Sequence, residues 1–367
     1  MQLGLFTMPS HPPECSLYDG HEWDLQTLRW ADELGFSEAW IGEHHVAPWE
    51  PHPSPDLLIA QSLKETTQMR MGPGGFLLPY HHPAELANRV AMLDHMAQGR
   101  LNFGIAASGL PSDWAMFNVD GMSGQNREMT RESLEIILKL WTEDEPFDYA
   151  GKFWHVSQPD LMFETLRPHI KPLQKPHPPI GVAGLSKNSD TLKMAGEKGF
   201  IPMSLNLNPA YVGSHWDAVE EGARRGGRVA HRGDWRLVRE IFVAETDEKA
   251  MKLSAGNMMG RMMREYFLPL LDSFGFKEFL KHDPSVPDSD VTPDYCARHN
   301  WLVGSPSTVV ERLEQVYDEV GGFGSILLFC FDYREQPDAW HDSMEMLAKE
   351  VIPKVAHLQP QSGTAVA

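Results

Sequence analysis

The sequence is poor in cysteine. Its 367 residues include three, Cys15, Cys296 and Cys330, and no two of them form a Cys-x-x-Cys pair. Such an odd, sparse set argues against a disulfide framework and favours a reducing compartment. No Lys or Arg precedes Arg29, so a secretory signal is not expected, and no apolar run reaches the roughly 18 residues that a membrane helix needs. We therefore expect a soluble, cytoplasmic protein.

Positive charge is also scarce. The chain has 32 Lys and Arg against 51 Asp and Glu, a formal net charge of −19, and it has no long basic cluster. This balance argues against nucleic acid and anionic membranes as partners and suits a small neutral ligand. Its 42% hydrophobic and 23% charged residues are typical of a soluble globular protein.

The histidine pattern argues against a catalytic metal. The first apolar run, Leu3–Met8, has no His-x-His pair, and the pairs His44-His45 and His81-His82 are adjacent rather than alternating. Neighbouring side chains on a strand point to opposite faces, so adjacent histidines cannot easily share one ion.

Strand-like and helix-like segments alternate along the chain. Eight strands are expected, at Gln2–Met8, Glu38–Glu43, Met71–Leu78, Leu101–Ala107, Pro179–Gly184, Ile201–Asn206, Leu237–Glu245 and Ser325–Asp332. The clearest helices are expected at Asp24–Leu34, Ala84–Met96, Arg127–Trp141, Ala210–Arg225 and Thr308–Val320. This alternation predicts an α/β protein with a (β/α)8 TIM barrel. We expect a single domain over residues 1–355, with insertions at 108–125, 146–178 and 265–300 and a flexible tail at 356–367.

The strongest chemical signal is Glu43-His44-His45, where the second expected strand stops. In parallel α/β barrels the reacting groups lie at the carboxyl ends of the strands. Alternation should turn His44 away from Glu43 and His45. We take His44 and Glu43 as candidate catalytic residues for proton transfer. The alternative is a histidine that is merely satisfied by backbone groups at a strand end.

The fifth expected strand runs through Gly184 and Leu185 into Ser186, Asn188 and Ser189, where a helix should begin. Free amides and the positive end of the helix dipole favour an anion there, and the hydroxyls add donors. These five residues therefore form a candidate phosphate site. An ordinary N-cap would use the same residue types.

Two further segments could border a ligand. Gly74 and Gly75 would allow close approach of a planar ring, although a bulge or barrel bend explains them equally well. Asn102 and Ala106 belong to the fourth expected strand, where small residues would leave room in the barrel mouth.

Several ordered blocks resemble the bacterial luciferase-like flavin monooxygenases, especially the limonene and diketocamphane (type II Baeyer–Villiger) groups. The blocks include Trp40–His45, Leu77–Ala84, Leu93–Ile105 and Gly184–Gly199. The resemblance implies reduced FMN, supplied by a separate flavin reductase, and oxygen addition at the flavin C4a to give a peroxide. It implies monooxygenation of an apolar, cyclic or terpenoid substrate, whether by Baeyer–Villiger oxygenation or by epoxidation or hydroxylation.

The resemblance also carries site roles. It assigns His44 to proton control, Gly74 and Gly75 to the back of the flavin ring, where relatives can carry a non-prolyl cis peptide, and residues 265–300 to a flexible lid. It further implies a homodimer packed through the helices after strands two and three. Ala106 stands where luciferase has a reactive cysteine, so light emission is not expected. A deazaflavin-dependent oxidoreductase and a non-catalytic flavin-binding protein remain alternatives on the same fold.

Overall fold

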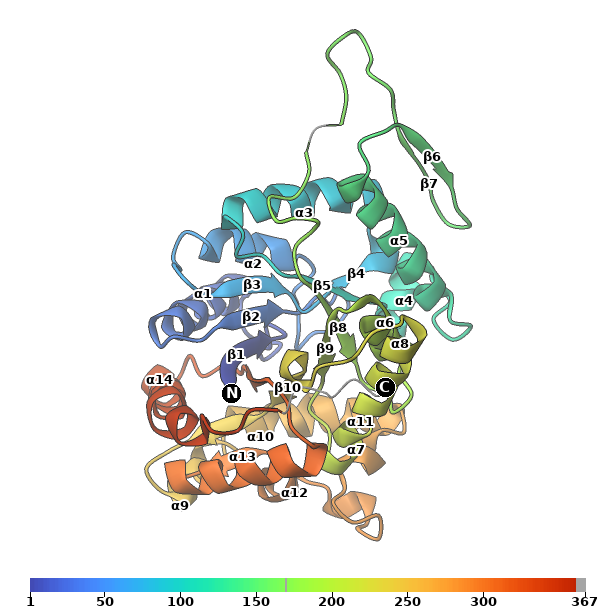
Figure 1. The fold of residues 1–367 in the computed structure, drawn as a ribbon. Coiled ribbons are helices and arrows are strands. Elements are labelled where there is room, and N and C mark those ends of the chain that lie inside the picture. The colour runs from blue at the N-terminus through green and yellow to red at the C-terminus, as the bar shows by residue number, and fades with distance from the viewer. Residues whose placement is uncertain (169, 361–367) are drawn as a thin grey trace.

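The computed structural model describes residues 1–168 and 170–360 as a ring of parallel strands surrounded by helices (Figure 1). The strands are β1 (Gln2–Thr7), β2 (Glu38–Ile41), β3 (Arg70–Pro73), β4 (Phe76–Leu77), β5 (Phe103–Ala106), β6 (Phe147–Ala150), β7 (His155–Gln158), β8 (Ile180–Gly184), β9 (Ile201–Ser204), β10 (Arg236–Arg239), β11 (Ile241–Val243), β12 (Leu302–Gly304) and β13 (Ser325–Phe329).

The α-helices are α1 (Leu17–Glu33), α2 (Pro55–Ser62), α3 (Pro83–Ala97), α4 (Pro111–Phe117), α5 (Gln125–Thr142), α6 (Asp190–Lys198), α7 (Pro209–Gly213), α8 (His215–Arg225), α9 (Asp247–Leu253), α10 (Met258–Met262), α11 (Leu268–Ser273), α12 (Pro293–His299), α13 (Pro306–Val320) and α14 (Pro337–Met346). Short 3-10 segments and two π-helical segments, Met263–Phe267 (η3) and Leu347–Val351 (η6), complete the described chain. None of the described helices is long and apolar enough to cross a membrane.

The main sheet closes into a barrel, as predicted. Its order is β3-β2-β1-β13-β10-β9-β8-β5-β4, with parallel pairing throughout. Strands β3 and β4 are two halves of the third predicted strand. β4 pairs with β5, and Met71 of β3 forms a bridge to Leu101, just before β5. When β3 and β4 are counted as one strand, the barrel has eight strands. Each lies near a predicted range, which confirms the (β/α)8 barrel.

Several boundaries differ from the prediction. The seventh strand is split at Glu240 into β10 and β11, and β11 pairs with β12, a strand that was not predicted. Helix α1 begins at Leu17 rather than at Asp24, because the Ser16 side chain caps it by accepting the Asp19 backbone N–H.

The three predicted insertions contain regular structure. Residues 108–125 include α4, residues 146–178 include the β6–β7 hairpin, and residues 265–300 include α11 and α12. The hairpin and the chain that follows it project away from the barrel (Figure 1). Residues 361–367 of the predicted tail lie outside the described residues, and the single-domain assignment stays a prediction.

The interior of the barrel is filled by protein. Trp40 of β2 is fully buried there, and a Cβ added at Gly181 or Gly104 would lie 2.6 Å or 3.2 Å from its ring. Nearer the amino ends of the strands, Arg236 pairs with Glu38 at 2.9 Å across the interior. These layers form a core that closes the barrel below its carboxyl end.

Candidate active site

His44 lies just beyond the carboxyl end of β2, between two acids. Its Nδ1 is 3.2 Å from Oδ2 of Asp113, and its Nε2 is 3.6 Å from Oε2 of Glu50. The imidazole is 16% exposed, whereas Asp113 and Glu50 are 0% and 3% exposed. Each ring nitrogen therefore faces a buried carboxylate, while part of the ring stays accessible.

Asp113 fixes the orientation of His44. It belongs to the first turn of α4 and also accepts the backbone N–H groups of His45 and Val46, at 3.2 Å and 2.9 Å. Burial lowers the pKa of His44, but the hydrogen bond to Asp113 and the charges of Glu50 and Asp113 outweigh it and raise the pKa above its ordinary value. The imidazole thus holds a proton more readily than a free histidine.

Glu50 is the second acid beside His44. Its carboxylate accepts a 2.7 Å hydrogen bond from the hydroxyl of Tyr266, which lies in η3. Burial raises the pKa of Glu50, and the charge of His44 and the Tyr266 hydrogen bond offset only part of that rise. The cluster of His44, Asp113, Glu50 and Tyr266, called the His44 cluster below, joins three separate parts of the chain and can store and transfer a proton.

Glu43 points away from the His44 cluster, as the alternation predicted. It is 1% exposed and accepts hydrogen bonds from Nε2 of His45 (2.8 Å), from Nε2 of His81 (2.9 Å) and from the Leu77 amide (3.1 Å). Burial raises the pKa of Glu43, but the hydrogen bonds to His45 and His81 outweigh it and keep the pKa below its ordinary value. Glu43 thus ties the end of β2 to β4, and a catalytic role for it stays a prediction.

Gly74 and Gly75 are enclosed by neighbouring strands. A Cβ at Gly75 would lie 2.4 Å from the Ile105 amide, and one at Gly74 would lie 3.1 Å from the Phe6 ring. Both glycines therefore allow β3 and β4 to approach their neighbouring strands closely. This agrees with the bulge or barrel bend that the sequence analysis gave as the alternative explanation of these glycines. The one cis peptide among the described residues is Lys175–Pro176, so the bond between Gly74 and Gly75 is trans.

Asn102 immediately precedes β5, and Ala106 ends it. The Asn102 side chain is 1% exposed and accepts a 2.9 Å hydrogen bond from Nε of Arg70, on the amino side of the barrel. This position separates it from the His44 cluster. Ala106 is the last residue of β5 and is partly exposed at the carboxyl end.

The predicted phosphate segment forms the loop between β8 and α6. Gly184 is buried, and a Cβ there would lie 2.4 Å from Leu192 of α6, so this glycine brings helix and strand together. Ser189 is the N-cap of α6 and accepts the Leu192 amide, as the capping alternative predicted. Ser186 and Asn188 are exposed, and their side chains make no hydrogen bond within residues 1–168 and 170–360. Leu185 lies beside them, half-buried.

Aromatic side chains form an apolar wall at the carboxyl end of the barrel. Phe267 of η3 lies edge-on to Phe329 of β13, with ring centroids 5.8 Å apart, and Phe329 stacks on Phe6 at 6.1 Å. Beside them Tyr266 stacks on Trp49 at 6.5 Å. The wall and the His44 cluster share η3, so proton-handling and apolar groups lie next to each other.

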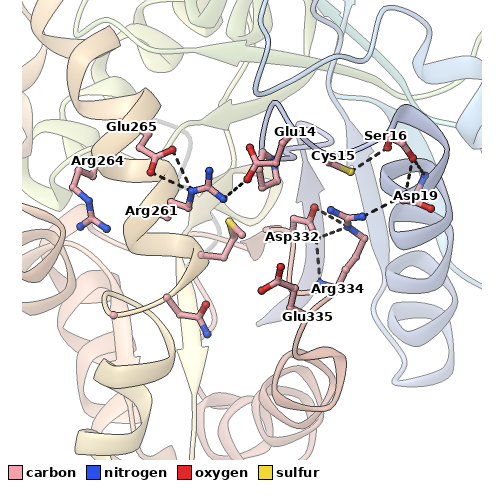
Figure 2. Close-up of a pocket in the computed structure, with 14 residues that line it drawn as sticks. Glu14, Cys15, Ser16, Asp19, Arg261, Arg264, Glu265, Asp332, Arg334 and Glu335 are labelled. Atoms are coloured by element: carbon pink, nitrogen blue, oxygen red, sulfur yellow. Dashed lines mark hydrogen bonds and ion pairs between the residues drawn. The ribbon is translucent and has the colours of Figure 1, made fainter.

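A separate hollow of about 470 Å³ lies between the loop after β1 and the segment formed by α10 and η3 (Figure 2). Its lining is mostly charged, and Arg261 spans it with hydrogen bonds to Glu14 (2.7 Å) and Glu265 (3.1 Å). None of the His44 cluster lines this hollow. Its charged lining suits a polar ligand rather than an apolar one.

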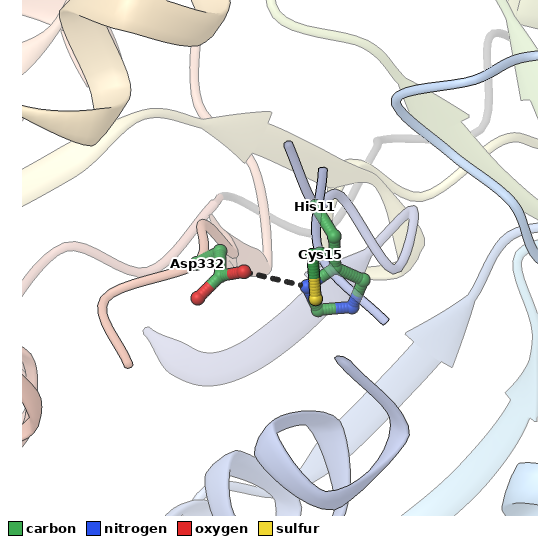
Figure 3. A group of neighbouring side chains, drawn as sticks. All are labelled: His11, Cys15 and Asp332. Atoms are coloured by element: carbon green, nitrogen blue, oxygen red, sulfur yellow. Dashed lines mark hydrogen bonds and ion pairs between the residues drawn. The ribbon is translucent and has the colours of Figure 1, made fainter. Parts of the chain in front are cut away.

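Next to the hollow, His11, Cys15 and Asp332 bring three potential metal ligands within 4.8 Å of one another (Figure 3). The ring of His11 already has a carboxylate at each nitrogen, Asp332 at Nδ1 and Asp24 at Nε2, both at 3.0 Å. Two carboxylates require a proton on each nitrogen, and they raise the pKa of His11 to about 9 despite its burial. We therefore interpret His11 as a buried imidazolium that joins β1, α1 and the end of β13.

Sequence reasoning missed Asp113, Glu50 and Tyr266. A weak signal was available for Asp113, an acid within the loop 108–125 that the sequence marked as long, and for Glu50, six residues after His44. Tyr266 is 216 positions from Glu50, and no sequence signal indicated that the two residues would meet.

Comparison with known proteins agrees with the predicted resemblance. The family described as "Luciferase-like monooxygenase" matches residues 1–322. The chain is 32% identical to 2,5-diketocamphane 1,2-monooxygenase 1 of Pseudomonas putida (97% of this chain, 99% of that one) and 28% identical to limonene 1,2-monooxygenase of Rhodococcus erythropolis (96% and 86%). Among solved structures, the oxygenating constituent of 3,6-diketocamphane monooxygenase of P. putida, a type II Baeyer–Villiger monooxygenase in complex with FMN, matches with a TM-score of 0.91 and 30% identity over 99% of each chain.

Proposed function

Because the chain belongs to the luciferase-like monooxygenase family, we propose that this reduced-flavin monooxygenase inserts one oxygen atom of O2 into an apolar cyclic ketone. The observation that carries the proposal is His44, held between Asp113 and Glu50 at the carboxyl end of the barrel beside an aromatic wall. A histidine whose pKa is raised can donate a hydrogen bond to a carbonyl oxygen, whereas an alkene offers no such acceptor. The 32% identity to a diketocamphane monooxygenase supports the same choice over limonene-type epoxidation.

The chain's own residues fit FMN. The exposed side chains of Ser186 and Asn188 stand at the start of the nine-residue helix α6, where unpaired donors and the helix dipole suit a phosphate. Asp190 in the first turn opposes an anion, but Arg131 of α5 lies 3.9 Å from its carboxylate and offsets that charge. When bound in its reduced form, FMN supplies the electrons that activate oxygen. We assign the phosphate end to Ser186 and Asn188.

The protein residues perform the remaining tasks. The aromatic wall receives the apolar part of the substrate and excludes water, which strengthens the electrostatic effect of the His44 cluster. Asp113 keeps Nδ1 of His44 protonated, so Nε2 is the atom that can give or take a proton at the substrate oxygen. General acid–base assistance of this kind contributes about 10²–10⁴-fold.

We also propose that the oxygenase works in the cytoplasm with a transient flavin reductase. Cys15, Cys296 and Cys330 are free thiols, which suits a reducing compartment. A reductase partner is consistent with a 28% identical relative that is named as the oxygenase component of a flavin-dependent trigonelline monooxygenase.

We further propose a homodimer packed through α2 and α3. Leu57 on α2 and Met92 and Met96 on α3 are 68%, 54% and 44% exposed, and a second copy would cover them. The double change Leu57→Lys and Met92→Lys should convert a dimer to a monomer in sedimentation equilibrium. Met122→Lys, at another exposed apolar residue, is the matched control and should leave the mass unchanged.

The function is tested with 18O2. The purified protein, anaerobically loaded with reduced FMN, is mixed with 18O2 and either a bicyclic ketone or limonene, and products are analysed by mass spectrometry. We expect a lactone that carries one 18O atom, and we expect its loss in His44→Phe with the Kd for reduced FMN unchanged. Binding of reduced FMN without an 18O-labelled product from either substrate would refute the proposal, and labelled limonene oxide alone would replace the ketone with an alkene.

A further inference from the structure

Tyr266 occupies an unusual place in the chain. It lies in η3, a π-helical segment of five residues inserted between α10 and α11. Single π turns inside α-helices occur frequently at functional sites. Here the Tyr266 hydroxyl reaches Glu50 at 2.7 Å.

The ring of Tyr266 is held in place independently of its hydroxyl. It stacks on Trp49 with planes 21° apart and lies beside Phe267, with ring centroids 5.2 Å apart. Trp49 is itself held by Arg261, whose guanidinium lies 5.4 Å from the centre of the Trp49 ring. A phenylalanine at position 266 would keep these contacts and lose one hydrogen bond.

Glu50 depends on that hydrogen bond. Within residues 1–168 and 170–360, the Tyr266 hydroxyl is the single hydrogen-bond donor to the buried Glu50 carboxylate. The charged groups that face Glu50 are His44, with Nε2 at 3.6 Å, and Asp113, whose negative charge opposes ionisation of Glu50. A buried carboxylate that loses its one donor becomes easier to protonate.

His44 in turn depends on Glu50. Three acids act on it: Asp113 from α4, Glu50 from the loop after β2 and, more weakly, Glu43 from its own segment. If Glu50 becomes neutral, one of the two adjacent negative charges that favour the imidazolium is lost. A substitution at Tyr266 should therefore change the pKa of His44 indirectly, through Glu50.

We propose that Tyr266 is a positioning residue that favours the ionised form of Glu50 and thereby sets the proton affinity of His44. The catalytic consequence rests on the proposed function, in which His44 gives or takes a proton at the substrate oxygen. The segment α10–η3–α11 thus takes part in the proton chemistry as well as forming the apolar wall. Nothing in the reaction requires Tyr266 to contact the substrate.

The test is Tyr266→Phe in the full-length protein without flavin. The pKa of His44 is measured by NMR in protein labelled with [13Cε1]histidine, with the His44 signal assigned by its absence in His44→Gln. We expect the pKa of His44 to fall by about one unit, a tenfold change in proton affinity, because one neighbouring charge is neutralised. Tyr333→Phe is the matched control, since the Tyr333 hydroxyl donates to the Leu253 carbonyl and not to an acid.

A double-mutant cycle distinguishes this coupling from a general structural effect. Glu50→Gln alone should lower the pKa of His44, and adding Tyr266→Phe to Glu50→Gln should lower it no further. An unchanged pKa of His44 in Tyr266→Phe, or a full additional shift in the Glu50→Gln background, would overturn the inference.

Turnover separates this inference from the proposed function. In active enzyme, the inflection in the pH profile of kcat should move in Tyr266→Phe by the amount that NMR measures, with KM for the ketone changed less than about twofold. If NMR shows the shift while the kcat profile does not move, Tyr266 does set the proton affinity of His44, and the proposed catalytic role of His44 fails instead. The resting-state titration thus decides the inference by itself.

Discussion

Because of His11, the free energy of unfolding of this protein should decrease as the pH rises from neutral to mildly alkaline values. The ring is 5% exposed and bonds to Asp24 of α1 and to Asp332 beyond β13, each at 3.0 Å. Burial lowers its pKa, but the charges and hydrogen bonds of the two acids outweigh it and raise the pKa from 6.5 to about 9. Since the folded pKa exceeds the unfolded one, this contribution is complete below about pH 6.5 and is lost as pH rises through 9.

The magnitude follows from the shift. At about 1.4 kcal/mol per pH unit, a rise from 6.5 to about 9 corresponds to about 3.5 kcal/mol of unfolding free energy. That amount is a substantial part of the roughly 5–15 kcal/mol that separates a typical folded protein from its unfolded chain. The loss should be spread over the interval from pH 6.5 to about 9 and should level off above it.

The assay is urea unfolding at several pH values from 6 to 10, for the wild type, Asp24→Asn and His11→Gln. Asp24→Asn retains a similar shape but removes one of the two negative charges, so its stability should depend less on pH. His11→Gln should be less stable at pH 6.5 by about 3 kcal/mol and should lack the wild-type slope. His357→Gln, at an exposed histidine, is the control and should run parallel to the wild type. Parallel curves for wild type and His11→Gln would refute the buried imidazolium.

Three further predictions concern the site. Asp113→Asn keeps an acceptor for the backbone amides but presents an NH2 group to Nδ1 of His44, so the pKa of His44 should fall and the kcat inflection should move to lower pH. Glu43→Gln removes the buried charge that His45 and His81 share, and urea unfolding should report a loss of about 3 kcal/mol. Ser186→Ala should weaken reduced FMN by about 3- to 10-fold in anaerobic titration while leaving riboflavin, which has no phosphate, unaffected. An equal loss for both flavins would place the phosphate elsewhere.

The sequence could predict the barrel because its signals are local. The alternation of apolar runs with amphipathic segments located all eight barrel strands. The period of two along a strand placed Glu43 and His44 on opposite faces. The ordered blocks around Trp40–His45 and Gly184–Gly199 identified the family, which the comparisons confirmed. Boundaries were weaker, since Ser16 starts α1 earlier and Glu240 interrupts the seventh strand.

The tertiary structure decided which residues share a site. Asn102 directly precedes β5, a strand that the sequence located, but its pairing with Arg70 sets it at the amino end of the barrel. At Gly75, the atoms that a side chain would meet belong to a neighbouring strand, so this glycine permits close strand packing. Neither fact can be read from local pattern, since both depend on what other strands bring to the same place.

The sequence by itself therefore determined the fold, the family and the position of His44, all of which follow from local periodicity and ordered motifs. Only the tertiary structure brought Asp113, Glu50 and Tyr266 around that histidine, from α4, the loop after β2 and η3. The physical reason is that the proton affinity of His44 depends on charges within a few ångströms, and distance along the chain carries no information about those charges.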